Sequence, residues 1–74
     1  MAKFQMYDVV RVVRVPIDQT NGNQAGTRAA RIGDTGTVVM AYESPREGYT
    51  VEAVSGDGRT EWLLDFNSED LEKL

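Results

Sequence analysis

The side chains able to do chemistry in this chain are carboxylates, arginines and aromatics, because it contains no cysteine and no histidine. The commonest general base, the commonest metal ligand and any thiolate nucleophile are therefore missing. Ten of the twelve carboxylates follow residue 33. Asp57 with Asp65, or Glu69 and Asp70 with Glu72, could offer oxygen ligands to a hard cation, but neither set has the alternating spacing of a calcium loop. We expect a solvated acidic surface with no catalytic residue, no metal and no cofactor.

Glycines at three positions are expected to form structural turns. Gly33-Asp34-Thr35-Gly36 is not a phosphate-binding loop, because no lysine follows it and the carboxylate of Asp34 would repel phosphate. Gly33 and Gly36 therefore bracket a turn, and one of them should have a positive φ, which glycine tolerates best. Asp57-Gly58 predicts a tight hairpin.

Arginines and aromatics supply the candidate binding residues. Arg28 and Arg31 stand at the end of a polar segment, residues 16–31, and could pair with carboxylates of a protein partner. Tyr42, Tyr49 and Trp62 are candidate aromatic anchors, since aromatic residues and arginine are enriched at interface centres. The alternative is that a domain this small needs its aromatics in the core. The residues alone leave both interpretations open.

Charge is divided unevenly along the 74 residues, whose net charge is −4. Residues 1–33 hold five basic and two acidic side chains, a charge of +3, whereas residues 34–74 hold three basic and ten acidic side chains, a charge of −7. Four arginines could line a nucleic-acid-binding edge with Tyr7 or Tyr42 stacking on bases. The acidic balance opposes this function, because nucleic-acid-binding domains are commonly basic.

The elements that must position these residues read as strands. Nine valines favour strands, since branched side chains pack well on a pleated surface. Within the first strand, residues 7–15, Val10 and Val12 share one face and Val9, Arg11 and Val13 share the other. Both faces are partly apolar, so we expect one to be core and the other to be partly covered. Further strands are predicted at 37–42, 49–54 and 60–66, followed by a capped helical turn at 67–71 and a short strand at 72–74.

Three stretches carry a resemblance that covers nearly the whole chain: Tyr7-Asp8-Val9-Val10, Ile32-Gly33-Asp34-Thr35-Gly36-Thr37-Val38-Val39 and Ser68-Glu69-Asp70-Leu71. In this order and spacing they resemble a family of small bacterial proteins known only as a domain of unknown function. That family is similar to barrels in nitrile hydratase β subunits and in the KOW modules of ribosomal and transcription proteins. The resemblance implies an all-β, five-stranded SH3-like barrel spanning residues 1–74, and it implies no catalytic residues.

We therefore predict a single all-β domain with a long loop at 16–31, acting as a non-enzymatic interaction or accessory module for a protein partner. The alternatives are a KOW-like nucleic-acid-binding barrel and an inhibitor or immunity-type protein that blocks one partner with its acidic face. A homodimer remains open, as does any role of the 16–31 loop. No apolar run approaches the ~20 residues of a membrane helix, and no signal-peptide core is present. We expect a cytoplasmic protein.

Overall fold

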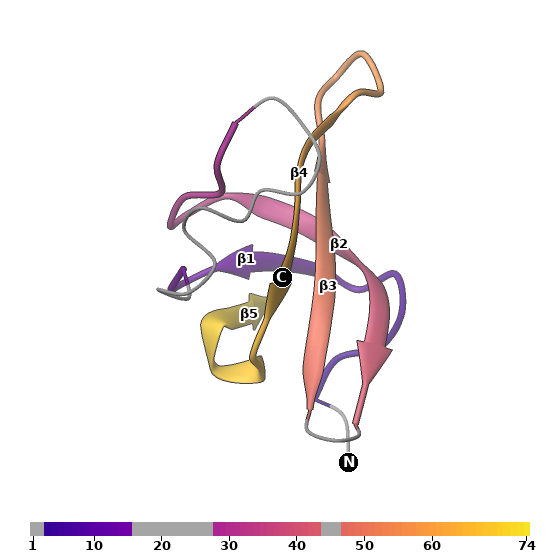
Figure 1. Ribbon diagram of the computed structural model, residues 1–74, viewed down its shortest axis with the longest axis vertical. Helices are drawn as coiled ribbons and strands as arrows, with labels where there is room; N and C mark the ends of the chain where they lie inside the picture. The colour runs from indigo at the N-terminus through magenta and orange to yellow at the C-terminus, as the bar shows by residue number, and fades with distance from the viewer. Residues whose placement is uncertain (1–2, 16–27, 44–46) are drawn as a thin grey trace.

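The computed structural model describes residues 3–15, 28–43 and 47–74, and these ranges form one antiparallel sheet of five strands (Figure 1). The order across the sheet is β4-β3-β2-β1-β5. The predicted all-β fold, with one helical turn before the last strand, is confirmed. The elements are β1 (Val9–Val12), β2 (Thr35–Tyr42), β3 (Gly48–Val54), β4 (Thr60–Phe66), the 3-10 helix η2 (Ser68–Asp70) and β5 (Leu71–Lys73).

Most of the predicted loop, residues 16–27, lies outside the described residues. Its last four residues, 28–31, are described and approach the edge strand β4, where the Arg28 amide donates to the Glu61 carbonyl at 3.1 Å. None of the helices in the described ranges has the length and apolar content needed to cross a membrane.

Strand β1 is shorter than the predicted 7–15, because Tyr7 has a φ of +73° and therefore leaves the extended conformation. Its alternation is otherwise as expected, with Val10 and Val12 fully buried. The second face is covered only in part, as predicted, since Val9 and Val13 are 48% and 40% exposed.

Strand β2 departs from simple alternation at a β-bulge. Val38 pairs with Val51 on β3 and is buried, whereas the next paired residue, Met40, lies opposite Thr50 and is exposed. Val38 and Met40, two positions apart along β2, therefore do not share a buried face. The extra residue of a bulge bends its strand, and Figure 1 shows the first half of β2 running across β3 before the strand turns along it.

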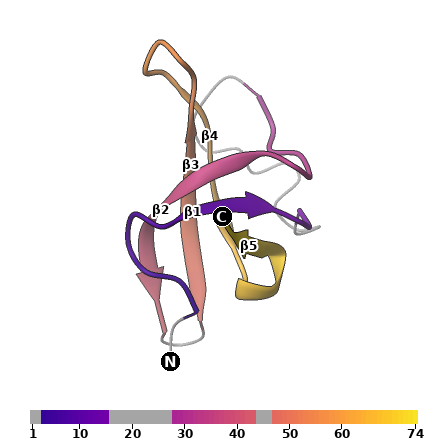
Figure 2. The same cartoon turned by 180° about the vertical axis from the view of Figure 1, so that it is seen from behind.

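The core lies between β1 with the first part of β2 on one side and β3 with β4 on the other (Figures 1 and 2). Strands β3 and β4 alternate between buried and more exposed residues, placing Tyr49, Val51 and Ala53 opposite Phe66, Leu64 and Trp62. Ring pairs meet edge to face, Phe4 with Tyr49 at 5.1 Å and Trp62 with Phe66 at 5.8 Å between centroids. The other buried apolar residues are Val10, Val12, Ala30, Val38 and Leu71.

The carboxylate of Asp70 fixes η2 and β5 against β1. It is almost fully buried, accepts Arg14 Nε at 2.8 Å and accepts the Asn67 amide at 3.0 Å. The Asp70 carbonyl also receives the amides of Val13 and Arg14. The predicted helical turn is capped, and Asn67 is its N-cap residue. These contacts give the buried carboxylate partners within the chain, as such a group requires, and they bring β5 beside β1.

Candidate functional site

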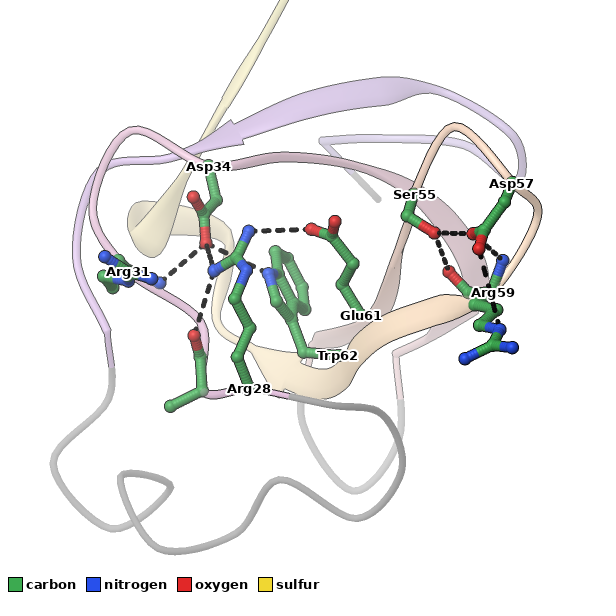
Figure 3. Close-up of polar contacts among 9 residues, drawn as sticks. Arg28, Arg31, Asp34, Ser55, Asp57, Arg59, Glu61 and Trp62 are labelled. Atoms are coloured by element: carbon green, nitrogen blue, oxygen red, sulfur yellow. Dashed lines mark hydrogen bonds and ion pairs between the residues drawn. The ribbon is translucent and has the colours of Figure 1, made fainter.

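Asp34 is the centre of a hydrogen-bonded cluster that joins a turn to β4 (Figure 3). One carboxylate oxygen, Oδ2, accepts three donors: Arg28 Nη1 at 2.7 Å, the Arg31 amide at 2.9 Å and Trp62 Nε1 at 3.0 Å. The Asp34 amide donates a hydrogen bond to the Arg31 carbonyl at 3.0 Å, and Gly33 between them has a φ of +96°. The turn from Arg31 to Asp34 is thereby stabilised by one hydrogen bond between main-chain groups and by one to the Asp34 side chain.

Arg28 completes this cluster from the other side. Its Nη2 donates to Glu61 Oε1 at 2.9 Å, so the guanidinium bridges Asp34 and Glu61. Burial alone would raise the pKa of Asp34, but hydrogen bonds from Arg28, the Arg31 amide and Trp62 outweigh it and hold that pKa below its ordinary value. The pKa of Arg28 is raised, chiefly through its hydrogen bond to Asp34. Both groups stay charged at neutral pH, so this carboxyl is not a proton donor there.

The arginines predicted to meet a partner are placed differently from each other. Arg28 is engaged by Asp34 and Glu61 of its own chain, which argues against its predicted role as a free partner-binding arginine. Arg31 is exposed, and within the described residues its side chain forms no ion pair. The segment that precedes them in the predicted loop lies outside the described residues.

Two of the three predicted aromatic anchors, Tyr49 and Trp62, lie in the hydrophobic core. Tyr49 and Trp62 have no exposed surface, so their prediction as exposed binding anchors is wrong, and the alternative that a small domain uses its aromatics as core is correct. The Tyr49 hydroxyl donates to Glu47 and accepts the Lys3 and Phe4 amides. Tyr42 is half-buried and its hydroxyl lies 2.7 Å from Thr50 Oγ1.

The predicted structural glycines are confirmed at two of three positions. Gly33 and Gly58 have φ values of +96° and +87° in turns, as expected. Gly36 lies within β2 rather than in a turn, and its φ is not positive. It is needed for close packing instead, because a Cβ there would lie 2.7 Å from Val51 Cγ1 and 2.8 Å from the Glu52 carbonyl oxygen.

Exposed apolar side chains gather on and around β1. Five of the eight large hydrophobic residues that are exposed in the described ranges lie on this strand, at its ends or beside it. Leu74 is tied to β1 by its amide, which donates to the Val9 carbonyl at 3.0 Å, and the Gly33 amide donates to the Val12 carbonyl at 2.8 Å, which places Ile32 at the other end. We call this surface the β1 face, composed of Tyr7 (73% exposed), Val9, Arg11, Val13, Ile32 (71%), Glu72 and Leu74 (58%).

Tyr7 is the most unusual member of the β1 face. The Asp8 amide donates to the Gln5 carbonyl at 3.1 Å, closing a turn in which Tyr7 holds the third position with a φ of +73°. Glycine is the residue that such a position favours. A tyrosine there is strained, and its ring is mostly in solvent. Composition and periodicity gave no sign of this conformation, whereas the alternation of Val9, Arg11 and Val13 did mark a second apolar face.

Comparison with known proteins places the chain in a family. Residues 6–73 match a family described as a domain of unknown function, DUF4926. The chain belongs to the DUF4926 family. The predicted resemblance to a family of unknown function is thereby confirmed. No curated protein and no solved structure matches the chain. The DUF4926 match includes the Asp34 cluster, η2 and every residue of the β1 face except Leu74.

Proposed function

We propose that this DUF4926 domain is a non-enzymatic interaction module that binds a protein through its β1 face. The observation that carries the proposal is the concentration of exposed apolar side chains along one strand. Single exposed hydrophobic residues are ordinary on a protein surface, but a group of them on neighbouring positions marks an interaction site. Val9 and Leu74 are neighbours by hydrogen bond, and Tyr7 and Val13 lie two and four residues from Val9 on the same strand or its end.

The charges beside the β1 face support a protein partner over a nucleic acid. Arg11 Nη2 lies 3.0 Å from Glu72 Oε2, and Lys73 Nζ lies 3.8 Å from Asp8 Oδ2. Both of these cations are therefore matched by a carboxylate of the same chain, so along β1 and β5 the described residues form no unpaired basic strip that could follow a phosphate backbone. An apolar centre with a charged rim is instead the composition of protein interfaces.

The same proposal includes a finer description of the fold and setting. An SH3-like barrel is supported by the five antiparallel strands, the bent β2 and the single helical turn directly before β5. A bacterial, cytoplasmic protein is supported by the resemblance carried by residues 7–10, 32–39 and 68–71 and by the absence of cysteine.

A site-specific crosslinker tests the binding surface directly. A photoreactive phenylalanine analogue is placed at Val9, and at Val54 as the matched control, because Val54 is 53% exposed at the end of β3 and outside the β1 face. We expect protein adducts on irradiation in native host cells from position 9 and not from position 54. Addition of Val13→Asp should remove the adduct while the circular dichroism spectrum stays unchanged.

Two results would contradict this function. Equal adducts from both positions, or adducts from neither, would show that the β1 face is not a binding surface. Retention of an oligonucleotide in a mobility-shift assay far below the micromolar range of non-specific binding, at physiological salt, would favour the nucleic-acid-binding alternative.

A further inference from the structure

We infer that the protein bound by the β1 face is a second copy of this chain, in a dimer with twofold symmetry. This inference rests on the proposed function and names its partner. In a twofold dimer the same patch is used by both copies, so residue i contacts residue j and residue j contacts residue i. The patch must therefore be complementary to itself, and the β1 face meets this condition in its charges and in its apolar pattern.

The charges that residues 8–11 and 72–73 bring to the β1 face and its border are balanced, although the chain as a whole carries −4. Arg11 and Glu72 are 44% and 52% exposed at their side chains, and Lys73 and Asp8 stand beside them. A surface selected for a partner of opposite charge would carry mainly one sign. A surface with equal numbers of both signs can instead meet its own copy, with each Arg11 reaching the Glu72 carboxylate of the other copy.

The residues of the β1 face are paired across β1 and β5. Arg11 lies opposite Glu72, and the Leu74 amide donates to the Val9 carbonyl, so Val9 lies beside Leu74. Residues two apart on one strand face are separated by about 6.6 Å. If the twofold axis runs along the strands between β1 and β5, the second copy places its Leu74 against Val9 and its Glu72 against Arg11. Apolar side chains then meet apolar side chains, and each arginine meets a carboxylate of the other copy.

Sedimentation equilibrium of the full chain over a wide range of concentrations measures the dimer. We expect a concentration-dependent dimer whose Kd rises about 100-fold or more in Val9→Asp, because symmetry introduces the unpaired carboxylate into the contact twice. Val54→Asp is the matched control and should leave Kd unchanged, since Val54 is equally exposed but lies outside the β1 face. A monomer at all concentrations, or a dimer that Val54→Asp weakens and Val9→Asp does not, would overturn the inference.

A charge-exchange experiment separates contacts between copies from the Arg11–Glu72 pair inside one chain. Arg11→Glu and Glu72→Arg each place like charges within a chain and across the symmetric contact, so each variant alone should dimerise weakly. In an equimolar mixture only the contacts across the interface regain opposite charges. We expect a heterodimer at least about tenfold tighter than either variant's own dimer. A mixture that associates no better than its components would contradict the twofold arrangement.

The crosslinking experiment distinguishes failure of this inference from failure of the proposed function. Adducts from position 9 that contain two copies of the chain support the dimer. Adducts from position 9 that contain only another protein, together with a monomer in sedimentation, overturn the dimer and leave the β1 face as a protein-binding surface. An absence of adducts from position 9, together with a monomer in sedimentation, would overturn both the dimer and the proposed function.

Discussion

Replacing Asp34 by alanine removes the acceptor that three donors share, and we expect it to lower the free energy of unfolding by about 2–4 kcal/mol. The largest share comes from Trp62, whose side chain is fully buried and whose indole N–H would lose its acceptor. A buried donor without a partner costs about 1–3 kcal/mol. The amide of Arg31 adds up to about 1 kcal/mol, because it is exposed and water can replace the carboxylate. Arg28 adds less than about 1 kcal/mol, since its partly exposed guanidinium keeps Glu61.

Urea unfolding followed by tryptophan fluorescence is the appropriate assay, because Trp62 is the single tryptophan and touches the altered site. Asp57→Ala is the matched control. Asp57 also accepts hydrogen bonds, from the Ser55 hydroxyl and the Arg59 amide, but it does so at the exposed β3–β4 hairpin (Figure 3). Its removal should lower stability much less. If the two variants lose equal stability, or if Asp34→Ala loses less than about 1 kcal/mol, the central role assigned to Asp34 is refuted.

Three further predictions concern other parts of the chain. Gly36→Ala should lower stability by about 1–3 kcal/mol through the clash of its Cβ with Val51, whereas Gly56→Ala, with no atom within 4 Å of the new Cβ, should stay within about 0.5 kcal/mol of the parent in urea unfolding. Folding lowers the pKa of Asp34, so the stability that its ionised carboxylate contributes is present above the unfolded pKa of about 3.9 and is lost as pH falls through the lower folded pKa. The difference in free energy of unfolding between the parent and Asp34→Ala should therefore narrow below pH ~4. Tyr7→Gly should raise the melting temperature, by the equivalent of about 0.5–1 kcal/mol, and weaken dimerisation, and a fall in melting temperature would show that the tyrosine ring stabilises the fold.

Strands β3 and β4 were predictable because their signals are local. Alternation of Tyr49, Val51 and Ala53 with polar residues specifies which side is buried, and the Asp57-Gly58 turn specifies the hairpin. The bulge in β2 was not predictable, since residues 38–42 form a continuous apolar run that does not mark where the alternation shifts. Its position depends on pairing with β3, which is a property of two strands together.

The Asp34 cluster could not be derived from the sequence for a similar reason. Its donors come from two separate parts of the chain, residues 28–31 and β4, and Trp62 stands 28 positions away from Asp34. The local pattern revealed only that Asp34 lies between two glycines and would repel phosphate. It also left open which glycine has the positive φ. The structure assigns that conformation to Gly33 and assigns to Gly36 a close contact with β3, a requirement that depends on a neighbouring strand.

A purely structural explanation of the β1 face accounts for only part of it. Valine at positions 9 and 13 is explained by strand propensity, because a branched side chain favours extended backbone even where it is exposed. This explanation does not extend to Tyr7 and Ile32, which lie in turns, where polar residues and glycine are preferred. Tyr7 in addition holds a strained φ, and neither side chain contributes to the buried core. Two large apolar residues outside the buried core therefore stand at opposite ends of a strand with one exposed face, and binding of another protein surface gives both of them a physical role.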